Sequence, residues 1–337
     1  MTHHYRVYGL HLRCNRELSL LPTSPEAKPD LDVHWSSTPD MSPDSGLEWR
    51  RVLTTELQQR IGISLWRAQS PGRSFTKLRY DTEKAHIDFI LAPTLDELWV
   101  VHAGAEPDSD LQAYFVGPAL GCILRLRGTL CLHASVVKID DCAVAILGKK
   151  KSGKSTSAAG LALLGAAVLS DDMAVLTPHD GGFLVQPGYP QVRLWPRSIA
   201  ALYPNRGTLP KVYTTRDKRY LRLGGEGSAA GTFWPSALPL AAIYVLGEIE
   251  NGDATPYIEA LPPQEKLMTL VENVFGSYVV IEELRQREFV ALGQVSKAIS
   301  LRRLMFGHDL ATLPEQSRAI IEDVRSRKRE EAAASFV

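Results

Sequence analysis

The sequence predicts an α/β protein with a β-rich N-terminal domain, and two patterns support this fold class. From Trp49 to Val101, aromatic and β-branched residues recur in strand-length runs that polar turns separate, a pattern typical of an antiparallel module. Farther along, an apolar strand expected over 142–147 leads into a loop rich in glycine and lysine, and then into a small-residue helix expected over 155–164. Both strands and helices therefore contribute to the second part of the chain.

The length of 337 residues suggests about two domains, and 45% hydrophobic residues is ordinary for a chain that folds around a core. We predict the β-rich domain over 1–110, a core domain over 111–313, and a charged C-terminal helix with a tail over 314–337. Within the first domain, residues 22–46 hold five prolines among several Ser and Asp residues, which favours a flexible surface loop.

Periodicity predicts the other elements. Weak alternation indicates a first strand over 5–13, and apolar residues at helical spacing indicate a helix over 111–127 that ends at Gly128. Two apolar runs on either side of Asp140 and Asp141 predict a hairpin. The remaining expectations are a buried strand over 238–247 and helices over 263–275 and 296–306.

The composition excludes several classes of protein. Lys and Arg number 38 and Asp and Glu number 38, so no net charge attracts nucleic acid or anionic lipid. The longest apolar runs are shorter than the roughly 20 residues of a membrane span, and the N-terminus leads into no secretory segment. The four cysteines contain no C-x-x-C pair, which favours a reducing compartment. We expect a cytoplasmic protein that binds neither nucleic acid nor membrane.

Residues 148–155 fit the pattern G-x-x-x-x-G-K-[ST] at every defined position. Gly148 and Gly153 allow the sharp turn that aims backbone N–H groups at phosphates, Lys154 would bridge the terminal phosphates, and Ser155 would bind Mg²⁺. A chance glycine–lysine turn is the alternative, but the strand before the loop and the helix after it favour phosphate binding. The residues expected to contact a nucleotide are Gly148, Lys149, Lys150, Lys151, Ser152, Gly153, Lys154, Ser155 and Thr156.

Asp171 and Asp172 interrupt an apolar run, 17 residues after Lys154. An unpaired buried carboxylate is costly, so the pair is expected to face a metal or solvent, although only one of two neighbours in a strand can face the phosphate site. A turn with two solvated acids is the alternative. His133 lies on the strand expected to pair with the one that enters the loop, and by its surroundings alone it is more typical of a hydrogen-bonded core residue than of a catalyst.

Three motifs in this order, LHASVV over 132–137, GKKKSGKS over 148–155 and LSDD over 169–172, resemble the core of HPr kinase/phosphorylase. More closely, the chain resembles the HPr-kinase-related serine kinases encoded with lasso peptides, which phosphorylate the precursor peptide on its C-terminal serine. The resemblance covers about residues 112–313. Later strings that also resemble this subgroup lie over 192–197, 218–221 and 238–246.

The resemblance implies a P-loop kinase core of the type shared with phosphoenolpyruvate carboxykinase, with a short mixed sheet. It implies that Asp171 is the general base for the attacking hydroxyl and that His133 orients or polarises that hydroxyl, beside Lys154. Asp172 and Ser155 would hold Mg²⁺, and ATP would supply the phosphate. The residue types agree with this, since phosphoryl transfer needs positioning, charge neutralisation and a proton acceptor.

The chain also departs from the HPr kinase pattern. Thr156 stands where HPr kinases usually carry an acid, and Met173 stands where an Arg often follows the two aspartates. No stretch resembles the segment that contacts HPr. These departures leave open whether HPr is the substrate and whether the reverse phosphorylase activity exists. HPr kinases assemble as hexamers, but the different N-terminal part of this chain leaves its oligomeric state open.

Between Gln191 and Leu223, eight basic residues accompany a single acid, Asp217. A solvated surface is the ordinary explanation of such a run. A peptide that ends in serine, however, presents a carboxylate beside the reactive hydroxyl, and Arg side chains match carboxylates well. The residues expected to bind that carboxylate or the transferring phosphate are Arg193, Lys218 and Arg219.

The leading interpretation is an ATP- and Mg²⁺-dependent serine kinase that acts on a ribosomally made peptide with a C-terminal serine. A kinase of another protein or of a small hydroxyl compound is the alternative in the same reaction class. A nucleotide-binding regulator that transfers no phosphate is the alternative from another class. Asp171 argues against that regulator, because a sensor needs metal ligands but no base.

Overall fold

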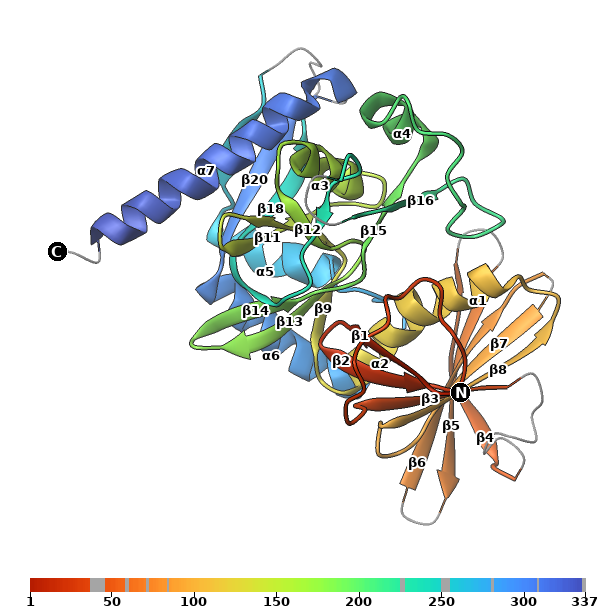
Figure 1. Ribbon diagram of the computed structural model, residues 1–337. Helices are drawn as coiled ribbons and strands as arrows, with labels where there is room; N and C mark the ends of the chain where they lie inside the picture. The colour runs from red at the N-terminus through yellow and green to blue at the C-terminus, as the bar shows by residue number, and fades with distance from the viewer. Residues whose placement is uncertain are drawn as a thin grey trace. The chain divides into compact units, whose positions relative to one another are not determined.

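The computed structural model describes residues 1–36, 46–57, 61–70, 73–83, 85–224, 228–249, 255–279, 282–307 and 309–334. The chain divides into two compact units (Figure 1). The first unit contains Met1–Thr129 and Gly276–Gln286, and the second contains Leu130–Phe275 and Arg287–Val337. The boundary expected near residue 110 thus differs from this division, which keeps the helices up to residue 126 with the first unit.

The first unit is built on an eight-stranded sheet with the order β1-β2-β3-β8-β7-β6-β5-β4. Its neighbours from β4 to β8 are antiparallel, which confirms the module predicted over 49–101, whereas β3 is parallel to both β2 and β8. The strands are β1 (His3–Val7), β2 (Leu10–Cys14), β3 (Leu31–Ser36), β4 (Trp49–Leu57), β5 (Ile61–Ser70), β6 (Arg73–Asp81), β7 (Ala85–Leu91) and β8 (Glu97–Gly104).

Two expectations for this unit need correction. The single strand predicted over 5–13 is a hairpin, because Tyr8 and Gly9 turn the chain with φ of 56° and 81°. The loop predicted over 22–46 contains strand β3, in which alternate side chains are buried in the sheet although prolines precede them. Residues 37–45 of that predicted loop lie outside the described residues.

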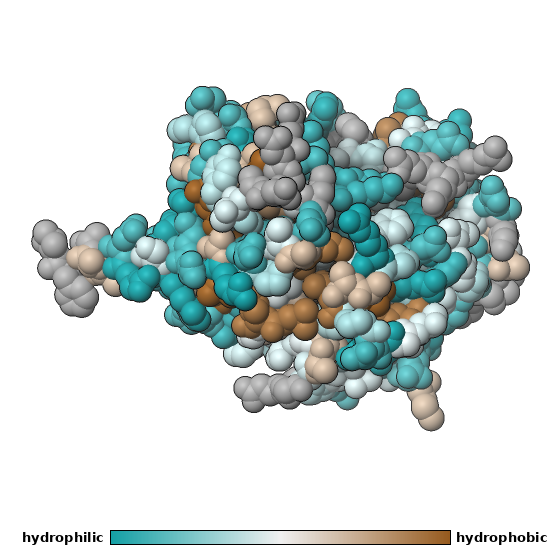
Figure 2. Space-filling model, turned by 90° about the horizontal axis from the view of Figure 1, so that it is seen from above, coloured by the Kyte–Doolittle hydropathy of each residue, from teal (hydrophilic) through white to brown (hydrophobic). Residues whose placement is uncertain are grey.

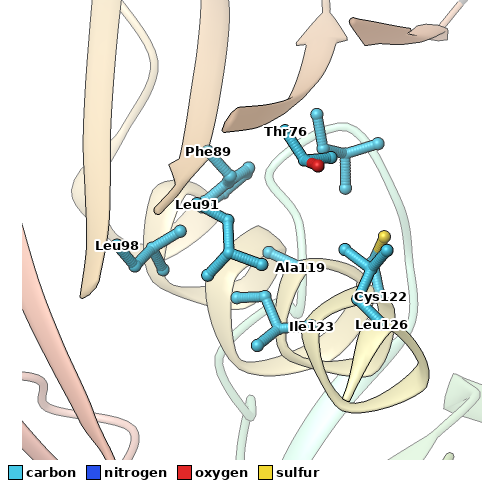
Figure 3. Close-up of a pocket in the computed structure, with 9 residues that line it drawn as sticks. Thr76, Phe89, Leu91, Leu98, Ala119, Cys122, Ile123 and Leu126 are labelled. Carbon is cyan, nitrogen blue, oxygen red and sulfur yellow. The ribbon is translucent and has the colours of Figure 1, made fainter. Parts of the chain in front are cut away.

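The helices of the first unit lie against one face of its sheet (Figure 1). They are α1 (Asp108–Tyr114), a π-helical turn η2 (Phe115–Ala119) and α2 (Leu120–Leu126), so the predicted helix over 111–127 is confirmed. A small pocket remains between α2 and strands β6, β7 and β8, and its lining is apolar except for the hydroxyl of Thr76 (Figure 3).

The second unit contains a ten-stranded mixed sheet, whose main path runs β17-β12-β10-β11-β18-β14-β13-β9, with β20 beside β18 and β19 beside β20. Its strands are β9 (Leu130–Leu132), β10 (Ser135–Ile139), β11 (Cys142–Leu147), β12 (Ala167–Ser170), β13 (Ala174–His179), β14 (Gly182–Gln186), β17 (Thr232–Phe233), β18 (Leu238–Glu248), β19 (Tyr257–Ala260) and β20 (Ser300–Phe306). A separate two-stranded sheet pairs β15 (Gln191–Leu194) with β16 (Arg219–Arg222). The helices are α3 (Lys154–Leu163), α4 (Pro196–Leu202), α5 (Pro263–Glu272), α6 (Glu282–Ala298) and α7 (Leu313–Ala334), with a 3₁₀ turn η3 (Leu310–Thr312).

Helices cover both faces of this larger sheet. In β11, Val144 and Ile146 join one core cluster with α3, α4 and α7, while Ala143, Ala145 and Leu147 join another with α5 and α6. A strand buried on both faces reads as a continuous apolar run, which is why the predicted strand over 142–147 and the buried strand over 238–247 are confirmed. The α/β class is confirmed as well.

The C-terminal part of the second unit contains one wrong prediction. The segment 296–306 was expected to be a helix, but only its first residues end α6, and 300–306 form β20, parallel to β18. Over so short a run, the spacing of its apolar residues is compatible with both the helical and the strand period. Pairing with the buried strand β18 decides for a strand. The helices expected over 155–164 and 263–275 are confirmed as α3 and α5, and the C-terminal helix is confirmed as α7 up to Ala334. Residues 335–337 of the expected tail lie outside the described residues.

Helix α7 carries the predicted charges along its exposed side. Figure 2 shows its end as a mainly hydrophilic projection. Arg325 pairs with Asp140 at 3.0 Å and Lys328 pairs with Asp141, so α7 is attached to the turn of the predicted β10–β11 hairpin, which is confirmed. No helix among the described residues is long and apolar enough to cross a membrane.

Candidate active site

The loop of residues 148–153 connects the buried strand β11 to the first turn of α3. Three of its residues have positive φ: Gly148 (153°), Lys151 (70°) and Gly153 (104°). A Cβ at Gly148 would also lie 2.6 Å from the Ser152 Oγ and 3.1 Å from the Leu246 Cβ, so glycine is needed there for space as well as for conformation. The loop is thus a tight turn at the N-terminus of a helix, where backbone N–H groups have no helical partners.

Lys154 is the first residue of α3, and its side chain folds back over the loop. It is 7% exposed, and its Nζ donates to the Gly148 carbonyl at 2.8 Å and to the Lys149 carbonyl at 3.1 Å. The pKa of Lys154 is lowered to about 8, mainly by burial, with Asp172 opposing the shift and Lys218 adding to it. A buried ammonium whose proton is destabilised would gain from an anion at this position.

The other residues of the motif differ in their surroundings. Lys149, Lys150 and Lys151 are exposed, and Ser155 is half-buried in the first turn of α3. Thr156 is buried, and its Oγ1 lies 2.9 Å from the Ser198 Oγ of α4. This hydrogen bond connects α3 to α4. 

Asp171 follows directly after β12, and a hydrogen bond holds each of its carboxylate oxygens. Ser135 Oγ donates to Oδ1 at 2.6 Å, and the backbone N–H of Arg193 donates to Oδ2 at 2.7 Å. The residue is 5% exposed. Since each carboxylate oxygen has two lone pairs, Asp171 keeps acceptor capacity while its orientation is fixed.

Asp172 occupies the left-handed region, with a φ of 74°, and its side chain faces Arg193. Arg193 is buried, its NH1 donates to Asp172 Oδ2 at 2.7 Å, its NH2 donates to the Tyr189 hydroxyl at 2.6 Å, and its guanidinium lies 5.7 Å from the centre of the Tyr220 ring. Burial alone would raise the pKa of Asp172, but the nearby Arg193, His133, Lys218 and Lys154 together outweigh burial and hold that pKa well below the ordinary value. Asp172 is therefore ionised throughout the physiological range.

His133 lies between β9 and β10, and its Nδ1 is 2.9 Å from the backbone carbonyl oxygen of Asp172. A carbonyl only accepts, so Nδ1 carries the proton and Nε2 keeps a free lone pair when the ring is neutral. Burial lowers the pKa of His133, with the charge of Lys154 acting in the same direction, which favours that neutral ring at physiological pH. The sequence predicted a hydrogen-bonded histidine at position 133. His133 is thus also a member of the acid cluster, which consists of Asp171, Asp172, Arg193 and His133.

The structure brings most of the predicted site residues together. Asp171, Asp172 and Arg193 are joined by direct hydrogen bonds, and His133 is bonded to the Asp172 backbone. Lys218 influences the pKa values of Asp172, His133 and Lys154, which places its charge beside the cluster. Arg219 instead donates to the Leu209 carbonyl at 3.2 Å.

Comparisons with known proteins find similarity among solved structures. No family model matches the sequence, and no curated protein matches it. The chain is similar to the Hpr(Ser) kinase/phosphatase from Coxiella burnetii, with 12% sequence identity and a TM-score of 0.31, over 60% of this chain and 98% of that chain. The function is therefore inferred from the arrangement of the side chains.

Sequence reasoning missed three residues that hold the acid cluster in place. Ser135 positions Asp171, and Tyr189 and Tyr220 enclose the guanidinium of Arg193. Ser135 follows His133 by two residues, the spacing of side chains on one face of an extended chain, and this was a usable signal. The tyrosines gave none: Tyr189 lies four residues before Arg193 and Tyr220 pairs with Arg193 between β15 and β16, and only the fold shows that both contact the guanidinium.

Proposed function

We propose that this protein is an ATP- and Mg²⁺-dependent serine kinase, and that its acceptor is the C-terminal serine of a lasso precursor peptide. The observation that carries the proposal is the immobilised carboxylate of Asp171 in one buried cluster with an ionised Asp172, in the same unit as the loop that Lys154 covers. Phosphoryl transfer requires a proton acceptor, a metal-binding acid and a cation for the phosphates. The residues supply one of each.

Asp171 is suited to accept the proton of the acceptor hydroxyl. In the proposed step, the serine oxygen forms a bond to the γ-phosphorus, the bond from that phosphorus to the bridging oxygen of ADP breaks, and Asp171 receives the hydroxyl proton. Its hydrogen bonds with Ser135 and with the Arg193 backbone keep the carboxylate in one orientation during this exchange. His133, neutral with its Nε2 lone pair available, would orient the same hydroxyl.

Asp172 and Ser155 are suited to hold Mg²⁺. Arg193 engages Asp172 Oδ2 at 2.7 Å, while Oδ1 lies 3.7 Å from His133 Nδ1 and remains suited to a cation. Mg²⁺ in kinase sites takes one or two protein oxygens and completes its shell with water and phosphate oxygens. Within the described residues, no three His, Cys, Asp or Glu side chains gather into a metal site, which agrees with a metal that the nucleotide shares. When bound, it would neutralise charge on the phosphates.

The proposed acceptor explains why the basic side chain of Lys218 lies beside the acid cluster. A C-terminal serine carries its α-carboxylate next to the reactive hydroxyl, so a cation beside Asp171 and His133 could bind it. Of the three residues expected for this role, Lys218 fits best, because its charge acts on His133 and Asp172. The guanidinium of Arg193 is engaged within the protein, and we propose that it positions Asp172.

Intact-mass spectrometry tests the proposal directly. Peptides that end in serine, as free acid and as amide, are incubated with the full chain, Mg²⁺ and ATP. We expect the mass of one phosphoryl group on the free-acid peptide, less on the amide, and none with Asp171→Asn. Lys218→Gln should reduce the preference for the free acid, whereas Arg222→Gln, on an exposed side chain of the same segment, should retain it.

Other results would change the assignment. Equal phosphorylation of the free-acid and the amidated peptide would contradict the proposed contact with the peptide carboxylate. The kinase proposal would still stand. Transfer to other hydroxyl compounds but to no peptide would favour the small-molecule or other-protein alternative. ATP binding without transfer to any acceptor would favour a nucleotide-binding regulator.

A further inference from the structure

The exposed tryptophan next to the glycine–lysine loop is suited to bind the base of a nucleotide. Trp195 is the most exposed of the six tryptophans, at 39%, and all six lie among the described residues. A single exposed apolar side chain is ordinary on a protein surface, so the neighbours of Trp195 decide whether the ring has a binding role.

Trp195 is tied to the loop from two directions. The Nζ of Lys151, at the tip of the loop, lies 6.0 Å from the centre of the indole ring. Ser198, in the helix that Trp195 precedes, is bonded to Thr156 in the first turn of α3. The ring is thus a neighbour of the loop proposed to hold phosphates, on the side of its exposed lysines.

The backbone around Trp195 is rigid. Leu194 before it is buried in the core, and β15 pairs with β16. Pro196 after it fixes the start of α4, where the Ile199 N–H donates to the Trp195 carbonyl at 3.1 Å. An aromatic ring on a rigid support loses little freedom when a flat ligand stacks on it.

We propose that Trp195 is the stacking surface for the nucleobase of the bound nucleotide. The inference rests on the proposed function, since a nucleotide in the loop requires a place for its base. Base-on-aromatic stacking is tolerant of base identity, because every base has a π face. The site therefore accepts purine nucleoside triphosphates with little discrimination between adenine and guanine.

Calorimetric titration of the full chain with MgATP and with magnesium tripolyphosphate, which has the phosphates but no base, tests this role. Trp195→Ala should weaken MgATP binding about tenfold and leave tripolyphosphate binding unchanged. Trp195→Phe, which retains an aromatic face, should bind MgATP within about threefold of the wild type. MgGTP should lose affinity in Trp195→Ala by a similar factor.

The two ligands separate failure of this inference from failure of the proposed function. If the wild type binds both ligands and Trp195→Ala binds MgATP as tightly as the wild type, the stacking role is wrong and the kinase proposal stands. An equal loss for MgATP and tripolyphosphate would mean that Trp195 supports the loop, which also overturns the stacking role. If the wild type binds neither ligand, both proposals fail.

Discussion

The two units bury cations in different ways. In the first unit, Lys77 is buried, and its ammonium lies 4.2 Å from the centre of the Trp49 ring and 5.9 Å from that of Trp66. In the second unit, Lys154 is buried against the carbonyl oxygens of its own loop, and burial lowers its pKa. The faces of Trp49 and Trp66 stabilise the ammonium of Lys77 inside the fold. Burial instead destabilises the ammonium of Lys154, and a bound anion would stabilise it.

This difference indicates that the first unit acts as a scaffold and that Lys154 belongs to a functional site. Charges that are matched within the fold contribute to stability, while a buried cation with a perturbed pKa beside ionised acids reduces stability in exchange for binding or catalysis. Substitutions among the residues of the proposed active site should therefore change chemistry more than stability. Substitutions in the first unit should do the reverse.

Asp171→Asn should give the largest effect. We expect the rate of phosphoryl transfer to fall about 10³-fold, because the amide accepts no proton and places an N–H group against one of the two donors that hold the carboxylate. MgATP affinity should stay within about threefold. Initial rates and titration calorimetry measure the two quantities.

Asp180→Asn is the matched control, since Asp180 is an acid in the β13–β14 turn whose side chain is 87% exposed. Its transfer rate should equal that of the wild type. A similar loss of rate in both variants would contradict the role of Asp171.

Leu98→Ala tests the scaffold side of the comparison. Leu98 is fully buried and lines the pocket under α2, so its truncation enlarges an existing void and should destabilise the first unit by about 3 kcal/mol. Urea denaturation measures the loss. MgATP affinity of the folded variant should remain unchanged, and a weaker affinity would show that the two units do not divide the roles.

Lys154→Met tests the cost of the buried ammonium through pH. Because folding lowers the pKa of Lys154 from 10.5 to about 8, the unfolded chain binds more protons between these values. The stability of the wild type relative to Lys154→Met should therefore rise from pH 8 to pH 10, by about 2 kcal/mol, and stay constant below pH 7. Denaturation of both proteins across this range measures the difference. A difference that is flat with pH would contradict the burial of a charged lysine.

Ser135→Ala should have a smaller effect on chemistry. Loss of the hydroxyl that donates to Asp171 Oδ1 should lower kcat about tenfold, because the carboxylate loses one of the two donors that fix its orientation. Ser135→Thr, which retains a hydroxyl, should recover part of the rate. An unchanged kcat in Ser135→Ala would make Ser135 structural.

Ser170→Ala provides the matched control for Ser135→Ala. Ser170 is also buried, and its Oγ donates to the Met173 carbonyl at 2.6 Å. Its loss should reduce stability by about 1 kcal/mol without lowering kcat. An equal loss of kcat in both variants would indicate a general loosening of the turn.

The sequence predicted the loop–helix unit and the acid pair because each depends on local chemistry. Glycines at 148 and 153 satisfy a backbone requirement of their own turn, and the apolar runs around Asp171 mark a buried strand end. Contacts made by strand pairing between distant segments could not be predicted in the same way. The contact of Arg193 with Tyr220, and the formation of β20 where a helix was expected, depend on such pairing.

Thr76→Val should give the smallest effect and replaces the hydroxyl at the pocket that Leu98→Ala enlarges. The Thr76 hydroxyl faces an otherwise apolar lining, so a methyl group of similar shape should stabilise the first unit by about 0.5 kcal/mol (Figure 3). Thr94→Val is the control, because its hydroxyl is bonded to Asp96 and its loss should lower stability instead. Urea midpoints measure both variants. A gain of stability with Thr76→Val and a loss with Thr94→Val would show that the first unit responds to packing and hydrogen bonding as a scaffold does. A loss of stability with Thr76→Val would mean that the Thr76 hydroxyl has a role that the apolar pocket does not reveal.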